Sequence, residues 1–137
     1  MLTGQCFCGA IRYEAAEHIR NQTLCHCTIC RRTTGAPAVA WFTLATGDFR
    51  FTAGEPSSFR SSSHATRTFC PHCGTQLTFA DDDSPDEIDV TTSSLDTPGK
   101  ALPQAEIFVA DALHWPDDLP RYPVSYTHLT LPTILLV

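Results

Sequence analysis

Seven cysteines, gathered in three short clusters, constrain this 137-residue chain more than any other feature. They are Cys6 and Cys8, then Cys25, Cys27 and Cys30, then Cys70 and Cys73. A C-x-C or C-x-x-C turn aims two sulfurs at one ion, and tetrahedral zinc binds thiolate sulfur at about 2.3 Å. The seven cysteines can therefore form one group of four and one group of three. We therefore expect two zinc ions, one in a closed four-thiolate structural site and one held by three thiolates with a position open to water or substrate.

A disulfide framework is the alternative explanation for so many cysteines. An odd number leaves one thiol unpaired, and the first residues lack the basic start and apolar stretch of a secretory signal. A redox C-x-x-C pair would need a thioredoxin-like βαβ context, which the sequence does not indicate. We expect a cytoplasmic protein whose cysteines bind metal.

Composition narrows the class of partner. The chain carries a formal charge of −6 with only nine Lys and Arg, which argues against nucleic acid, because its phosphates must be neutralised by clustered cations. No apolar run approaches the ~20 residues of a membrane-spanning helix. We predict a small-molecule substrate, no nucleic acid and no membrane partner, and the oligomeric state is left open.

The length fits one domain, which we assign to residues 1–123. The closing stretch changes character, because SYTHLTLPTILLV contains no Asp, Glu, Lys or Arg. We interpret residues 124–137 as a tail outside the domain, introduced by cloning or by misread sequence. An edge strand or an oligomer contact is the alternative.

Short segments of β type recur along the chain and are separated by turn residues. They are residues 10–15, 38–43, 48–52, 57–62, 65–69, 76–79, 87–92 and 105–109. Alternation of polar and apolar residues at 49–51 and 88–90 predicts half-buried outer or edge strands. Residues 27–33 and 93–95 are the modest helical candidates. The sequence predicts a mostly β fold, with Trp41 and Phe42 in its core.

The acidic run at residues 81–86 combines like charges with a proline, which oppose both helix and sheet. We predict a solvated hairpin tip. A calcium site is the alternative, but the run lacks the glycine and distal glutamate of a calcium loop.

The strongest local motif is Cys70-Pro71-His72-Cys73-Gly74, which has the form of a zinc knuckle. Gly74 permits the positive φ that turns backbone N–H groups toward the sulfurs. Two further ligands are needed, and Cys6-Phe7-Cys8-Gly9 offers them with the same trailing glycine. The pairs together would join the start of the chain to its middle.

The segment from Cys25 to Cys30 places three sulfurs within six residues, so that one ion can take all three. His26 and His72 are possible fourth ligands, although a residue between two ligands usually points away from the ion. Arg31 and Arg32 follow directly and could hold a substrate carboxylate through paired hydrogen bonds. A solvated basic turn is the alternative for the two arginines.

The three clusters in this order resemble the glutathione-dependent formaldehyde-activating enzyme family, which includes centromere-protein-V-like proteins. The likeness lies in residues 4–13, 25–31 and 69–75, continues through 106–109 to 117–120, and covers about residues 2–122. The resemblance implies a compact, zinc-stabilised Mss4-like fold of short antiparallel strands. It also implies a structural zinc on Cys6, Cys8, Cys70 and Cys73, and a labile, functional zinc on Cys25, Cys27 and Cys30.

The family's named activity joins glutathione, as co-substrate, to formaldehyde or cleaves the resulting carbon–sulfur bond. The resemblance thus implies a zinc-dependent carbon–sulfur lyase or synthase acting on S-hydroxymethylglutathione. The competing hypothesis is a non-catalytic zinc module that binds a thiol, a metal or a protein partner. Spacing alone does not select a proton donor among Glu106, Asp111 and His114.

Overall fold

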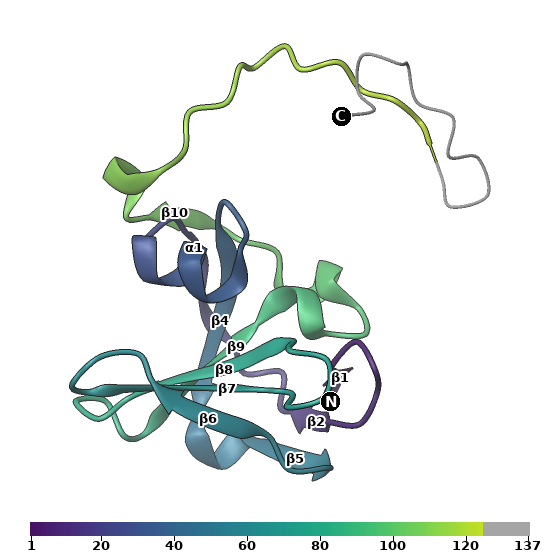
Figure 1. Cartoon of the computed structure of the whole chain (residues 1–137). Coiled ribbons are helices and arrows are strands. Elements are labelled where there is room, and N and C mark those ends of the chain that lie inside the picture. The colour runs from purple at the N-terminus through teal and green to yellow at the C-terminus, as the bar shows by residue number, and fades with distance from the viewer. Residues whose placement is uncertain (125–137) are drawn as a thin grey trace.

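The structure, a computed structural model, describes residues 1–124, which fold into two β-sheets and one short α-helix. The smaller sheet has the order β1 (Leu2–Gln5), β2 (Arg12–Ala15) and β5 (Phe49–Ala53), with antiparallel neighbours throughout. Figure 1 shows β5 and β6 at one end of the molecule and α1 with β10 at the other.

The larger sheet has seven strands. Its order is β10 (Ala105–Ile107), β3 (Arg20–Cys25), β4 (Val39–Ala45), β9 (Glu87–Thr91), β8 (Gln76–Asp81), β7 (Ala65–Phe69) and β6 (Ser57–Arg60). Neighbours are antiparallel, except that β10 runs parallel to β3. The predicted mostly β fold class is confirmed.

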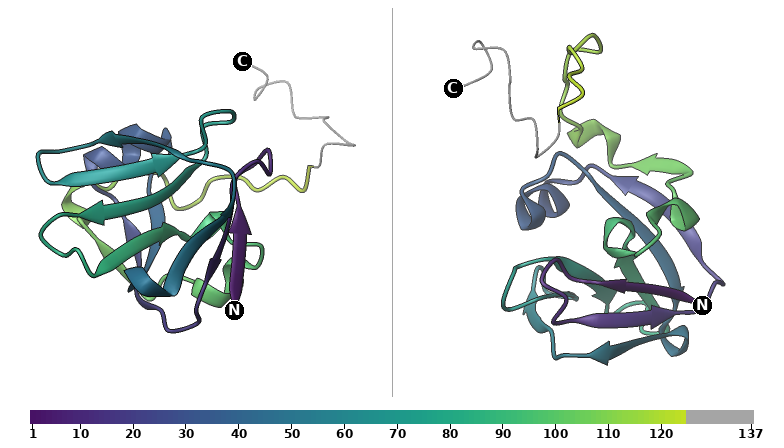
Figure 2. Two further views of the ribbon diagram at one scale, coloured as in Figure 1. Left: turned by 90° about the horizontal axis from the view of Figure 1, so that it is seen from below. Right: turned by 90° about the vertical axis from the view of Figure 1, so that its right-hand side faces the viewer.

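The main core lies where the two sheets meet, and the views in Figure 2 show the smaller sheet lying against the larger. Tyr13 from β2 and Phe42 from β4 are among its largest fully buried side chains. The Tyr13 hydroxyl is 2.6 Å from the hydroxyl of Ser94, so its buried polar end is satisfied. Trp41 packs in a second, smaller cluster with Cys25, Cys30 and Val39.

The helix α1 (Thr28–Thr34) begins after the N-cap residue Cys27 and ends at Gly35, which adopts a left-handed φ of 69°. This places the helix within one residue of the predicted segment 27–33. Four 3-10 turns complete the described elements: η1 (Thr46–Asp48), η2 (Thr92–Ser94), η3 (Pro98–Ala101) and η4 (Val109–Asp111). The candidate helix at 93–95 therefore corresponds to the single turn η2.

The strand predictions need two corrections. The sequence reading missed β1 and β3, and it was wrong in placing residues 88–90 at an outer or edge position. These residues belong to β9, which lies between β4 and β8 in the larger sheet. The polar residue in this alternation, Asp89, is accommodated inside the sheet because the Thr43 hydroxyl donates a hydrogen bond to it at 2.6 Å.

The acidic run forms the turn between β8 and β9, as predicted. There the imidazole Nδ1 of His64 lies 3.1 Å from Asp81, whose carboxylate also accepts a hydrogen bond from the backbone N–H of Asp83. These three residues could approach one ion, but their mutual hydrogen bonds already account for the arrangement.

No helix in residues 1–124 is long and apolar enough to cross a membrane. Apart from Val124, the stretch interpreted as a tail lies outside the described residues.

Candidate metal centres

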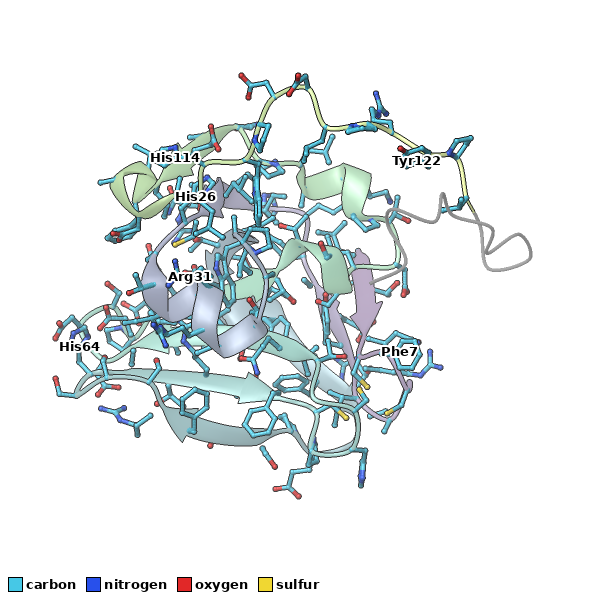
Figure 3. All side chains as sticks on the ribbon, turned by 45° about the horizontal axis from the view of Figure 1, so that its top comes forward. Phe7, His26, Arg31, His64, His114 and Tyr122 are labelled. Atoms are coloured by element: carbon cyan, nitrogen blue, oxygen red, sulfur yellow. The ribbon has the colours of Figure 1, made fainter. Side chains whose placement is uncertain are left out.

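The four-cysteine group is built by two turns from opposite halves of the chain. Cys6 and Cys8 lie between β1 and β2, and Cys70 and Cys73 lie between β7 and β8. All four sulfurs lie within 4.8 Å of one another. In Figure 3 the sulfurs of this site lie beside Phe7, away from His26.

The sulfur spacing in this group fits zinc. The Sγ atom of Cys8 lies 3.6 Å from that of Cys6 and 3.7 Å from that of Cys70. A tetrahedron with zinc–sulfur bonds of about 2.3 Å has sulfur–sulfur edges of about 3.8 Å. A disulfide would require about 2.05 Å. The residues therefore suit a closed tetrahedral site in which every ligand is a protein thiolate.

The backbone of both turns supports thiolate charge. Gly9 and Gly74 adopt φ of 78° and 82°, in agreement with the positive φ that the motif predicts for Gly74. The N–H of Ile11 donates to Cys6 Sγ at 3.3 Å, and that of His72 donates to Cys70 Sγ at 3.4 Å. Such donors stabilise negative sulfur.

The Thr75 hydroxyl reinforces this effect at Cys73. It lies 3.3 Å from the Cys73 sulfur, and hydrogen bonding from Thr75 lowers the pKa of that thiol to about 5. This direction favours the thiolate, the form in which cysteine binds zinc.

The three-cysteine group spans the connection from β3 to α1. Cys25 ends β3, Cys27 caps the helix, and Cys30 lies in its first turn. Their sulfurs lie within 4.8 Å of one another. Cys27 Sγ also accepts a hydrogen bond from the N–H of Cys30 at 3.2 Å, which satisfies one of the free donors of the first turn.

Two of these three thiols are buried, with Cys25 and Cys30 each 4% exposed. Burial raises the pKa of Cys25 to about 12, so that without a bound metal ion its thiol is neutral at pH 7. A bound divalent ion would reverse this preference, because a coordinating thiol is deprotonated. The donor set suits a thiophilic ion such as zinc.

Neither histidine of the cysteine clusters joins a sulfur group. His26 Nε2 lies 2.8 Å from the carboxylate of Glu106 on β10, and the His26 N–H donates to the Ile107 carbonyl at 3.1 Å. Among residues 1–124 no fourth Cys, His, Asp or Glu side chain approaches the three sulfurs closely enough to share an ion with them. Within this part of the chain the group therefore offers three ligands.

A cavity of about 370 Å³ opens onto the three sulfurs. Its walls include aromatic side chains from β4, β8 and the segment after β10, together with polar groups from the turn before β7. The residues that line it are Thr23, Cys25, Cys27, Ile29, Cys30, Trp41, Ser61, Ser62, His64, Ala65, Arg67, Phe79, Asp89, Ile107 and Phe108. This volume lies within the range of about 300–1,000 Å³ that is typical of small-molecule sites.

Phe108 has a strained backbone at the cavity. It adopts a φ of 54°, which is uncommon for a residue with a side chain, and the residue is 61% exposed. Such strain is often found at functional sites. The sequence does not indicate a left-handed φ at position 108, because the residue is neither glycine nor asparagine.

Sequence reasoning also missed Arg67, the arginine of this cavity. Its guanidinium is held 3.7 and 3.8 Å from the Cys30 sulfur, and it lies over the rings of Trp41 and Phe79. The period of two along β7 was the available signal, because it puts Arg67 on the same face as the buried Ala65. The predicted pair, Arg31 and Arg32, lies on α1 and does not line the cavity.

A larger groove of about 650 Å³ lies beside the four-cysteine site, bordered by Cys6, Cys73 and the start of β4. The larger volume does not make it the better candidate for chemistry. The neighbouring sulfur group offers four protein ligands to an ion and so would leave no open position, and the three-cysteine group does not line this groove.

Three comparisons place the chain among known proteins. The profile of the glutathione-dependent formaldehyde-activating enzyme family matches residues 1–111. An uncharacterized lyase of Schizosaccharomyces pombe is 35% identical over 77 residues, which are 56% of this chain and 56% of that protein. The chain thus matches little more than half the length of this curated relative.

A crystal structure of a Rhodobacter sphaeroides protein, a structural genomics target, has a similar fold. The two superpose with a TM-score of 0.58 at 27% sequence identity, over 69% of this chain and 87% of the other. The family profile covers most of the chain, including all seven cysteines. This chain belongs to the glutathione-dependent formaldehyde-activating enzyme family.

Proposed function

We propose that this chain is a zinc-dependent carbon–sulfur lyase or synthase that acts on adducts of glutathione with an aldehyde. The expected adduct is S-hydroxymethylglutathione, formed from glutathione and formaldehyde or cleaved to them. The observation that carries the proposal is a group of three cysteines facing a cavity without a fourth ligand among residues 1–124. Membership of the family and the lyase name of the yeast relative support the reaction class.

Cys25, Cys27 and Cys30 would hold the ion as thiolates. When bound, zinc supplies a lowered pKa for a substrate thiol and a Lewis acid for a carbonyl oxygen. The glutathione sulfur attacks the carbonyl carbon, one carbon–sulfur bond forms, and the π electron pair moves to oxygen. That oxygen gains the proton that the thiol has lost. No net oxidation occurs, and the reverse sequence cleaves the adduct.

The cavity walls suit a reaction that water would otherwise compete with. Trp41, Phe79 and Phe108 offer apolar surface around the open side of the cysteine group. His64 stands among the lining residues with Nδ1 toward Asp81, which leaves Nε2 free to exchange a proton with the new hydroxyl. We propose His64 for this role on position alone.

Arg31 and Arg32 follow Cys30 on α1 and are proposed to attract a carboxylate of glutathione. They stand outside the cavity wall, so a tripeptide would reach them only by extending beyond the cavity. This proposal concerns binding and leaves the chemical step to the cysteines.

The test is exchange between formaldehyde and glutathione, followed by NMR with and without the zinc-loaded protein. A control without protein is essential, because the two compounds combine unaided. We expect added protein to accelerate exchange above that control, and we expect Cys27→Ser to remove the acceleration. Serine can still cap the helix, so this variant separates loss of a metal ligand from loss of the fold.

If the zinc-loaded protein adds no rate above the control, formaldehyde and glutathione are not its substrates. A panel of other thiols and aldehydes then tests the reaction class. If Cys27→Ser retains full acceleration, the three-cysteine group is not the site.

A further inference from the structure

Arg67 is a buried cation without an acidic partner. Its side chain is 3% exposed, and no carboxylate within residues 1–124 forms an ion pair with it. Both terminal nitrogens contact Cys30 Sγ, and Nη1 also lies 3.4 Å from the Thr33 hydroxyl. Nε is buried and has no hydrogen-bond acceptor in the described part of the chain.

Burying a guanidinium costs several kcal/mol unless an anion compensates its charge. Asp89 is the acidic residue of the same cavity. Strand pairing puts it two strands away, because Arg67 is opposite Phe79 and Phe79 is opposite Asp89. Two strand spacings separate the two backbones by about 10 Å, Phe79 lies on the strand between them, and no ion pair joins the two side chains. Asp89 is therefore not the missing partner.

The sulfur of Cys30 is the group that the guanidinium does contact. A divalent ion held by three thiolates has a formal charge of −1, which the single charge of Arg67 would neutralise. The rings of Trp41 and Phe79 lie 5.7 and 5.0 Å from the guanidinium carbon, within the range of cation–π contact. They fix the guanidinium beside the sulfur group.

We infer that Arg67 is the counter-charge of the three-cysteine metal site and that it biases the open position toward an anionic ligand, a thiolate, over a neutral one. This inference rests on the proposed function, and it names a residue that favours the thiolate form of the substrate. A fourth thiolate gives the metal group a charge of −2, and Arg67 halves the uncompensated charge. A neutral ligand adds no negative charge, so Arg67 does not stabilise its binding in this way.

The competing role for Arg67 is packing, because its stem and guanidinium fill space between two aromatic rings. Two variants separate the roles. Arg67→Met keeps a long apolar side chain and removes the charge, whereas Arg67→Lys keeps the charge and removes the planar fork.

The test uses the full chain loaded with Co²⁺, whose absorption reports ligand exchange without any turnover. Cys27→Ser, loaded in the same way, supplies the spectrum of the four-cysteine site for subtraction. Each variant is titrated with 2-mercaptoethanol, which binds as a thiolate and has no carboxylate, and with imidazole, a neutral ligand. Circular dichroism checks that each variant is folded.

We expect Arg67→Met to weaken 2-mercaptoethanol binding by about tenfold or more, to leave imidazole binding within about threefold, and to be largely rescued in Arg67→Lys. Equal weakening of both ligands, or no change in either, would overturn the inference. Because neither probe is glutathione, this outcome does not depend on the formaldehyde exchange assay. Anion selectivity at cobalt without formaldehyde chemistry would refute the proposed substrates and leave the role of Arg67 intact.

Discussion

At the residue scale, the sheet beneath the cavity carries one buried and one half-buried ionisable group that do not pair. One row of paired residues crosses four neighbouring strands. Arg67 on β7 is paired with Phe79 on β8, which is paired with Asp89 on β9, and Asp89 is paired in turn with Thr43 on β4. Aromatic packing and the Cys30 sulfur accommodate the arginine. The aspartate instead accepts a hydrogen bond from the Thr43 hydroxyl. The two groups are therefore stabilised by separate neighbours and should respond to separate changes.

Burial raises the pKa of Asp89 above its usual value, and this predicts a pH-dependent effect of Asp89→Asn. Between the unfolded pKa of about 3.9 and the higher folded pKa, the folded chain binds more protons at this site than the unfolded chain. The stability that the neutral carboxyl contributes is present below that window and is lost as pH rises through it. An asparagine does not titrate, so the variant gains stability relative to wild type as pH increases.

The measurement is urea denaturation of the two zinc-loaded proteins at matched pH values from about 4 to 8, which begins at the lower edge of that window. Comparison at each pH cancels the zinc-dependent part of stability, which both proteins share. The quantity compared is the unfolding free energy of Asp89→Asn minus that of wild type. If it stays constant or falls with rising pH, the ionised carboxylate of Asp89 is no less stable in the fold than in water, and the prediction is wrong.

At the element scale, α1 is too short to be stable alone and depends on its cap and on the sulfur group. Isolated helices below about 12 residues are marginal in water. Here Cys27 supplies both the cap and one sulfur of the metal group. Substitutions at this residue can therefore distinguish the two contributions.

We predict that Cys27→Ser keeps the fold and binds one zinc fewer than wild type, whereas Cys27→Ala loses a further ~1 kcal/mol of unfolding free energy. Serine replaces the sulfur acceptor for the Cys30 N–H, and alanine does not. Metal analysis of the purified proteins gives the zinc count, and denaturation without added zinc gives the stability difference. An unchanged zinc count in Cys27→Ser would contradict its assignment as a ligand.

The elements also show what the sequence could and could not supply. Cysteine spacing and the trailing glycines predicted the local cysteine clusters, because the cysteines of each cluster lie close in sequence and the turns at Gly9 and Gly74 need positive φ. The joining of Cys6 and Cys8 with Cys70 and Cys73 was predicted from the need for four ligands and from the family resemblance, and the structure brings these four sulfurs together. The strand β3, with the sequence RNQTLC, was missed because four polar residues and little alternation hide a strand between two neighbours. The strand β1 was missed because it is short and contains Gly4.

The cavity could not be predicted for a different reason. Arg67 becomes part of the site because β7 and α1 meet, and only the tertiary arrangement brings residue 67 to residue 30. The edge position predicted for residues 88–90 was wrong for the same reason. Alternation of polar and apolar residues usually indicates a strand with one solvent-exposed face. At Asp89 the polar side chain instead accepts a hydrogen bond from Thr43 on the neighbouring strand.

At the scale of the whole molecule, the two sulfur groups should differ in what they hold together. The four-cysteine group joins turns that are 62 residues apart between Cys8 and Cys70, and so ties the smaller sheet to the far side of the larger one. The three-cysteine group spans six residues and joins one strand to the next helix. Closing a loop of that larger size contributes about 4 kcal/mol in the chain-entropy account, against a typical total stability of 5–15 kcal/mol.

Cys8→Ser should therefore lower the unfolding free energy by several kcal/mol more than Cys27→Ser does, because only Cys8 belongs to the group that closes the long loop. Cys8 is the better probe than Cys70, because Cys8 is exposed and Cys70 is fully buried in the core. Serine at Cys8 removes a ligand without placing a hydroxyl in apolar packing. Denaturation at a fixed, buffered zinc concentration measures the loss, and a strong chelator should bring wild type down toward the variant. Equal destabilisation by Cys8→Ser and Cys27→Ser would mean that both sites support the fold to the same degree.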